Sequence, residues 1–184
     1  MRFRIHHLAL LLLGAPALAQ QPKDQLHLKS SLNQQITVFK GTVFVNGNKA
    51  FFLHDEVNFA SRRNKLVEDA GAVFLFLELV KQPENQMLVL RIDHSNADSV
   101  AISVPSDVKD FDHDGQLEFG GKAAVPPPPS ADSVYYTPAR FYEIKKGSVT
   151  LDEAYTQQIE KKTNGVYLAF PYDASGKPIV IKKK

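Results

Sequence analysis

Hydrophobic positions between residues 36 and 119 follow the patterns of β-strands. The stretch from Ile36 to Val45 is rich in β-branched and aromatic residues, and the turn sequence Asn46-Gly47-Asn48 separates it from a return strand, Ala50 to Leu53. Two longer apolar runs, Val73 to Val80 and Met87 to Ile92, are bounded by turn residues and are short for buried helices. The pattern predicts that these two runs form a central hairpin buried on both faces.

One later segment has the pattern of a helix. Thr150 and Glu153 have the spacing of a capping box. The large apolar side chains of the segment recur every four positions, at Leu151, Tyr155 and Ile159. Asn164-Gly165 is a helix stop, and short strands are expected at Val166–Phe170 and Ile179–Ile181. The sequence therefore predicts an α+β fold, mainly antiparallel β in a meander or sandwich-like sheet, with one helix in the C-terminal region.

Four consecutive prolines interrupt this pattern within residues 122–133. Consecutive prolines favour an extended conformation without backbone donors. They could separate two domains, but the chain beyond them is marginal in length and in large apolar side chains for independent folding. We therefore predict a stiff surface loop inside a single β-rich domain, residues 20–184. Tyr135 and Tyr136 beside this loop are a candidate binding surface, because tyrosine suits half-exposed recognition sites; simple alternation, with one ring inside, is the favoured interpretation.

The first 19 residues have the three parts of a secretory signal peptide. Two arginines precede the apolar run Leu8 to Leu13, and Ala17-Leu18-Ala19 matches the small-x-small pattern of signal peptidase sites. Cleavage is expected between Ala19 and Gln20. The apolar run is shorter than the ~20 residues that cross a bilayer. We expect an exported protein, periplasmic or secreted, with no membrane span.

Charge and cysteine content bear on which classes of function are possible for this chain. The chain has 22 Lys+Arg and 20 Asp+Glu, and the two arginines of the signal segment account for the excess. A mature chain with no net charge gives no evidence for nucleic-acid or membrane binding. Acidic residues are in excess up to Gly121 and basic residues after it. The absence of cysteine excludes a disulfide framework, a thiolate zinc site and a cysteine nucleophile.

The segment from Asp110 to Glu118 carries the clearest chemistry. Calcium takes six to eight oxygen ligands at ~2.3–2.6 Å, several of them carboxylates. Counted from the first aspartate, loop positions one, three, five, seven and nine are Asp110, Asp112, Asp114, Gln116 and Glu118. Gly115 permits the sharp bend that such a loop needs. We expect four carboxylates and the Gln116 carbonyl to bind one Ca²⁺, with Glu118 direct or through water. Magnesium is less suited because it keeps its waters, and an acidic turn that binds no ion is the alternative.

The spacing begins like an EF-hand, but position twelve is Gly121 instead of a bidentate glutamate. The flanking segments, 100–104 and 117–119, are predicted as strands. A strand–loop–strand unit with an acid at position nine resembles the calcium loops of extracellular FG-GAP and VCBS-type β-repeat proteins. In those families the loop braces a β-hairpin or blade corner, so the resemblance implies a structural calcium ion. The resemblance is confined to the loop, and because the rest of the sequence has no repeating blade, we expect no propeller fold. Similar Asp-rich loops occur in small periplasmic proteins related to lysozyme inhibitors.

Patterns of catalytic residues are not found. The four histidines after the signal segment, His27, His54, His94 and His113, lack the spacing of a zinc site, and the chain has no Gly-x-Ser-x-Gly elbow. We expect a non-enzymatic module whose partner is a protein or a glycan. Two alternatives stay open. A small extracytoplasmic hydrolase would assemble its residues only in the fold, in a deep pocket with a perturbed acid or histidine. A periplasmic enzyme inhibitor would insert a protruding loop such as 122–133.

Overall fold

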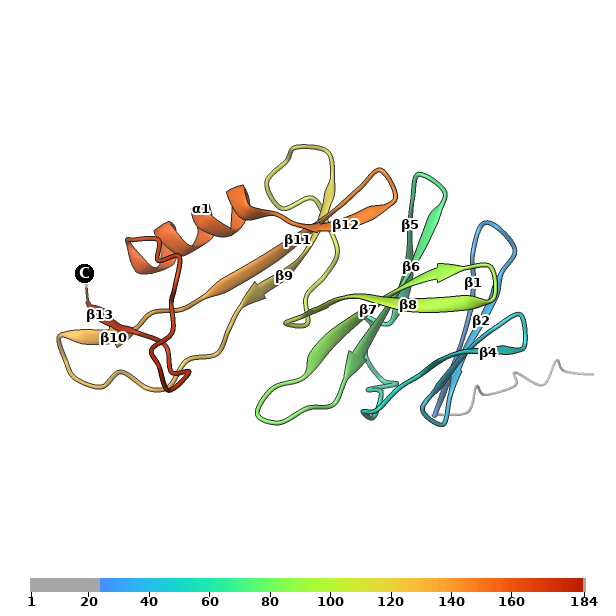
Figure 1. The fold of residues 1–184 in the computed structure, drawn as a ribbon, viewed down its shortest axis with the longest axis horizontal. Helices are drawn as coiled ribbons and strands as arrows, with labels where there is room; N and C mark the ends of the chain where they lie inside the picture. The colour runs from blue at the N-terminus through green and yellow to red at the C-terminus, as the bar shows by residue number, and fades with distance from the viewer. Residues whose placement is uncertain (1–23, 184) are drawn as a thin grey trace, which may run out of the picture.

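A computed structural model describes residues 24–183, which form antiparallel sheets and a single helix (Figure 1). The predicted fold class, α+β and mainly antiparallel β with one helix in the C-terminal region, is confirmed. The predicted signal peptide and its cleavage site between Ala19 and Gln20 lie outside the described residues. None of the helical structure within residues 24–183 has the length and apolar character needed to cross a membrane.

The first sheet is a four-stranded meander. Its strands, in spatial order, are β1 (Gln25–Lys29), β2 (Gln35–Phe39), β3 (Thr42–Val45) and β4 (Asn48–Phe52). Asn46 and Gly47 have positive φ angles and form the predicted β3–β4 turn. The stretch from Ile36 to Val45 is two strands, because Lys40 and Gly41 also have positive φ and turn the chain between β2 and β3.

The second sheet is the centre of the molecule. Its strands are β5 (Lys65–Asp69), β6 (Ala72–Leu79), β7 (Gln86–Asp93) and β8 (Asn96–Ser103), again a meander. Every residue of β6 is buried. Successive side chains of a strand point to opposite faces, so Val73 and Leu75 pack with the first sheet while Phe74 and Phe76 pack on the other side. The predicted central hairpin with two buried faces is confirmed.

The third sheet covers the second face of the central sheet. Its strands are β9 (Leu117–Lys122), β11 (Ala139–Lys145) and β12 (Ser148–Leu151), in the order β12-β11-β9. Phe119 of β9 packs edge-on against Phe76, with 5.0 Å between ring centroids. Gly120 has φ 120°, and a Cβ there would collide with the carbonyl oxygen of Arg140 on β11. A glycine is therefore required where the two strands approach closely.

The helix α1 (Glu153–Asn164) begins later than the capping box predicted. Thr150 lies in β12 opposite Glu143, and Asp152 is the N-cap, accepting a hydrogen bond from the N–H of Tyr155 at 2.9 Å. Leu151 also belongs to β12 and is 42% exposed, so it is not part of the helical face. Because Thr150 and Leu151 pair with β11 as part of β12, the helix begins after them. The predicted stop is confirmed, since Gly165 caps the helix in the left-handed conformation.

The buried side of α1 is polar. Its buried residues are Thr156 and Glu160, and the Glu160 carboxylate accepts hydrogen bonds from the Tyr136 hydroxyl at 2.6 Å and the Ala139 N–H at 2.7 Å. Burial and the bond to Glu160 raise the pKa of Tyr136 to about 12. Tyr136 is fully buried, which removes it from the candidate binding surface and agrees with the favoured alternation that places one ring inside. Tyr135 lies half-buried in the short strand β10 (Ser133–Tyr135).

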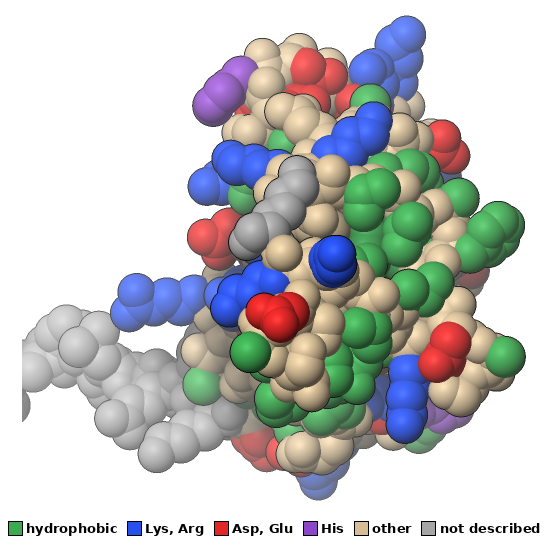
Figure 2. Space-filling view, turned by 90° about the vertical axis from the view of Figure 1, so that its left-hand side faces the viewer, with side chains coloured by type: hydrophobic (Ala, Val, Ile, Leu, Met, Phe, Trp, Pro, Cys, Tyr) green, Lys and Arg blue, Asp and Glu red, His purple; other side chains and the backbone are tan. Residues whose placement is uncertain are grey.

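The C-terminal end of the molecule exposes apolar side chains. β10 pairs with β13 (Val180–Lys182), but the strand expected at Val166–Phe170 does not form. Figure 2 shows hydrophobic side chains gathered on this end, with Lys and Arg side chains around them. Phe170 is 86% exposed, and Tyr172 is about half exposed. The segment after Gly121, in which basic residues outnumber acidic ones, therefore also exposes apolar side chains.

Candidate metal centre

The acidic loop is closed at its base by a pair of backbone hydrogen bonds. It lies between β8 and β9, and the N–H of Lys109 donates to the Glu118 carbonyl at 3.1 Å while the N–H of Glu118 donates to the Lys109 carbonyl at 2.9 Å. The intervening residues are thereby held as a compact loop between two strands. The predicted strand–loop–strand arrangement is confirmed, and the helices of an EF-hand do not flank this loop.

Asp110 organises the first half of the loop. Its Oδ1 accepts the N–H of His113 at 2.6 Å, and its Oδ2 accepts the N–H of Gly115 at 3.1 Å. Gly115 has φ 92° and His113 has φ 67°, so the chain turns sharply at both positions. His113 is exposed. The Asp110 carboxylate therefore lies at the centre of a tightly wound loop.

Two hydrogen bonds between residues two apart in sequence direct the other aspartates. Asp112 Oδ1 accepts the N–H of Asp114 at 3.2 Å, and Asp114 Oδ1 accepts the N–H of Gln116 at 2.8 Å. Such bonds from an aspartate to the backbone two residues on stabilise tight turns. Each carboxylate oxygen has a second lone pair available after accepting one N–H. The bonds that shape the loop therefore leave the oxygens able to bind a cation.

Four carboxylates of the loop meet in one place. One oxygen from each of Asp110, Asp112, Asp114 and Glu118 lies within 4.8 Å of the others. Oxygens that bind one calcium ion at ~2.3–2.6 Å are at most about 5 Å apart. The four oxygens thus fit a single coordination sphere. No other group of three or more potential ligand side chains comes together in residues 24–183.

Glu118 differs from the three aspartates in its burial. It has no exposed surface, and its Oε2 accepts the N–H of Phe111 at 2.6 Å. Its Oε1 is buried and has no hydrogen-bond partner within the described part of the chain. Burial, and then the charges of Asp112, Asp110 and Asp114, raise the pKa of Glu118 against the opposing effect of the Phe111 hydrogen bond. A buried carboxylate oxygen without a donor is costly, and a hard cation would satisfy it.

Aromatic packing connects the loop to the third sheet and the helix. The Phe111 ring lies 5.8 Å from the ring of Phe141 on β11 and 6.3 Å from that of Tyr155 on α1. Lys109 places its Nζ 4.9 Å from the centre of the Phe111 ring. Burial, followed by the nearby charges of Asp112, Glu118 and Asp152, raises the pKa of Tyr155. The position of the loop is therefore coupled to both elements.

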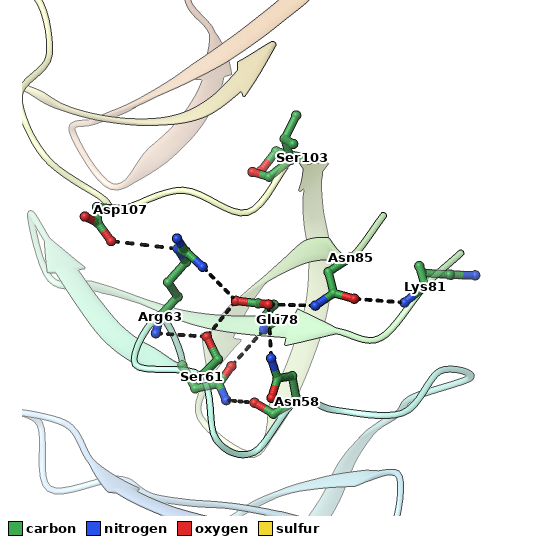
Figure 3. A network of polar contacts seen from close by, with 10 residues as sticks. Asn58, Ser61, Arg63, Glu78, Lys81, Asn85, Ser103 and Asp107 are labelled. Carbon is green, nitrogen blue, oxygen red and sulfur yellow. Dashed lines mark hydrogen bonds and ion pairs between the residues drawn. The ribbon is translucent and has the colours of Figure 1, made fainter. Parts of the chain in front are cut away.

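A second buried carboxylate, Glu78 on β6, was not indicated by the sequence. Figure 3 shows it surrounded by donors: Asn58 and Asn85 reach Oε1 at 3.1 and 2.8 Å, while Ser61 and Arg63 reach Oε2 at 2.6 and 3.2 Å. Burial alone would raise its pKa, but these hydrogen bonds lower it to about 2. Both oxygens are satisfied, so Glu78 is a structural anchor for the loop before β5, in contrast to Glu118.

Arg63 also points toward the segment that leads into the acidic loop. Its Nε lies 3.8 Å from Oδ1 of the exposed Asp107. The partners of Glu78 are 7 to 20 residues away in sequence, and no spacing rule for such networks exists. The remaining histidine candidates, His27, His54 and His94, are exposed and do not gather at a common site.

The structure thus brings together four of the five predicted calcium ligands, and the role of the Gln116 carbonyl stays a prediction. The likeness of the loop to FG-GAP and VCBS-type loops also stays a prediction. No family model, curated protein or solved structure matches this chain.

Proposed function

We propose that the chain is an exported, non-enzymatic β-domain whose loop from Asp110 to Glu118 binds one Ca²⁺ as a structural brace. The observation that carries the proposal is the group of four carboxylates within 4.8 Å, one of which, Glu118, holds a buried oxygen without a donor. Four negative charges in such proximity repel one another unless a cation lies between them. The Gln116 carbonyl is the proposed fifth protein ligand.

Calcium is the ion that this donor set favours. The side-chain ligands are all carboxylate oxygens, which suit hard cations, whereas zinc and copper sites use imidazole or thiolate. His113 is the one imidazole of the loop and is exposed. Magnesium prefers few protein ligands and octahedral geometry, and four carboxylates exceed what it commonly takes.

The position of the loop supports a structural role. Glu118 belongs to β9, and the next residue, Phe119, is fully buried in the core between the second and third sheets. The three aspartates belong to the loop tip. An ion between them would tie the tip to a core strand and would fix Phe111 against Phe141. Binding of this kind stabilises the folded state by mass action.

Thermal unfolding with and without calcium tests the proposal. At a free calcium concentration 100 times Kd, binding adds about 2.7 kcal/mol, which for a chain of this size raises Tm by about 5–11 °C. The double variant Asp112→Asn, Asp114→Asn keeps the turn hydrogen bonds but removes two charges, so we expect it to lose the rise and the binding heat in calorimetry. Asp98→Asn, Asp132→Asn, a matched pair of exposed aspartates elsewhere, should behave like the unaltered protein. Equal Tm values in chelator and in millimolar calcium for the unaltered protein would contradict the proposal.

The export part of the proposal rests on the N-terminal sequence. We expect the protein recovered from outside the cytoplasm to begin at Gln20, which N-terminal sequencing measures. Recovery of the protein in the cytoplasm with Met1 intact would contradict export.

A further inference from the structure

A groove lies beside the acidic loop, between β9 and the last turns of α1. Its volume is about 620 Å³, within the range of roughly 300–1,000 Å³ that is typical of small-molecule sites. Ser106 and Gly121 contribute to its wall, and the Phe111 ring of the acidic loop forms part of its lining. The groove therefore shares a residue with the candidate metal centre, although it is a separate feature.

Three lysines from different elements line the groove. Lys109 is at the base of the acidic loop, Lys122 ends β9, and Lys162 is in the last turn of α1. All three are exposed, and none is among the ion pairs formed within residues 24–183. One acid, Asp107, also lines the groove, but Arg63 lies 3.8 Å from it and offsets its charge. The groove is therefore net positive and suits an anion.

The rest of the groove lining is mainly apolar and includes two hydroxyl groups. Phe111, Phe141 and Ile159 present apolar surface, and Ser106 and Thr163 add hydroxyls. A sugar ring has an apolar face of C–H groups that packs on aromatic rings, and hydroxyls that bond to polar side chains. A sugar that also carries a carboxylate or sulfate would match the three lysines. Lysine binds such groups as a flexible point charge.

We propose that this groove binds a short acidic oligosaccharide, and that calcium in the loop strengthens its binding. The calcium clause rests on the proposed function. Phe111 connects the two sites, because its N–H donates to Glu118 at 2.6 Å while its ring lines the groove. An ion bound by Asp110 and Asp112, the neighbours of Phe111 in the chain, fixes the backbone on both sides of that ring. By linkage, the glycan strengthens calcium binding by the same factor.

Calorimetric titration with defined tetrasaccharides tests the groove. The probes are a hyaluronan tetrasaccharide, which carries carboxylates, a chondroitin sulfate tetrasaccharide, which adds sulfates, and the neutral chitin tetramer. We expect the acidic probes to bind and the neutral one to bind at least about tenfold more weakly, a difference that one charge-assisted contact supplies. Comparing the carboxylated and sulfated probes identifies which anionic group the groove prefers. Tetraglutamate binding as tightly as the sugars would overturn the choice of a glycan.

Two lysine variants of equal charge separate the groove from general electrostatics. Lys122→Ala, Lys162→Ala removes two of the three groove lysines, and Lys29→Ala, Lys49→Ala removes two exposed lysines of the first sheet. We expect roughly tenfold weaker glycan binding for the first pair and unchanged binding for the second. Equal losses in both pairs, or no acidic sugar binding at all, would overturn the proposal.

Separate calcium titrations keep the two sites distinguishable. The groove variant should bind calcium in the absence of glycan as the unaltered protein does. The protein could bind acidic glycan in chelator through Lys122 and Lys162 and yet bind no calcium. That result would support glycan binding in the groove and would overturn the claim that calcium strengthens it. If calcium binds and glycan affinity is the same with and without it, the coupling is overturned as well.

Discussion

Replacing Glu118 by glutamine should reverse the order of stability between calcium-free and calcium-bound protein. In chelator, the Glu118 carboxylate is buried, lacks a donor for Oε1, and faces three aspartates within 4.8 Å. At that separation each like-charge pair costs about 1 kcal/mol even with the dielectric constant of water, or about 3 kcal/mol for three. Glu118→Gln removes this repulsion, keeps an acceptor for the Phe111 N–H, and adds a donor for a neighbouring carboxylate.

We therefore expect the variant to be more stable than the unaltered protein in chelator by about 1–3 kcal/mol, a rise in Tm of about 2–12 °C. In calcium at 1,000 times Kd, the unaltered protein gains about 4.1 kcal/mol and the variant gains little, so the order reverses. Differential scanning calorimetry in chelator and in calcium measures the Tm of both proteins. Glu84→Gln, at an exposed position, is the control. A variant that is less stable than the unaltered protein in chelator would show that the Glu118 carboxylate is compensated without an ion, contrary to this prediction.

Three further predictions concern the framework around the site. The pKa of Glu78 is lowered from 4.5 to about 2, so its stabilisation is present above pH 4.5 and is lost as the pH falls toward 2. Glu78→Gln should remove about 2 kcal/mol of the stability difference that urea titrations measure between pH 7 and pH 3, whereas Glu84→Gln should not. Gly120→Ala should destabilise the protein by more than about 3 kcal/mol, since its Cβ meets backbone at positive φ; a change below 1 kcal/mol in the same titration would contradict the close approach of β9 and β11. Tyr136→Phe should cost about 1–3 kcal/mol by unpairing one bond of buried Glu160, and an unchanged Tm would show that this bond contributes nothing.

The central strands and the metal loop could be predicted because their signals are local. The run Val73–Val80 is apolar at every position but Glu78, which indicates burial on both faces, and the structure has sheets on both sides. Alternating aspartates followed by Gly115 dictate a tight acidic turn, whatever surrounds it. Both features depend on residues adjacent in sequence, so neither required knowledge of the fold.

The features that could not be predicted depend on distant contacts. Glu78 breaks an apolar run, and its compensating donors come from a loop and a turn elsewhere in the chain. Thr150 has the local signature of a helix cap, but pairing of β12 with β11 places it in a strand. Nothing in the sequence shows which of Tyr135 and Tyr136 is the buried ring. Tyr136 is the buried one, and its hydroxyl donates a hydrogen bond to Glu160 of α1 in the interior. In each case a tertiary partner decided the outcome.

A crystal structure of the protein grown with calcium, with anomalous scattering recorded, tests the central claim most directly. We expect one anomalous peak inside the loop, with oxygens of Asp110, Asp112, Asp114 and Glu118 at ~2.3–2.6 Å from it and the buried Oε1 of Glu118 bound either to the ion or to one of its waters. A loop without an ion in millimolar calcium, with the four carboxylates turned away from one another, would contradict it.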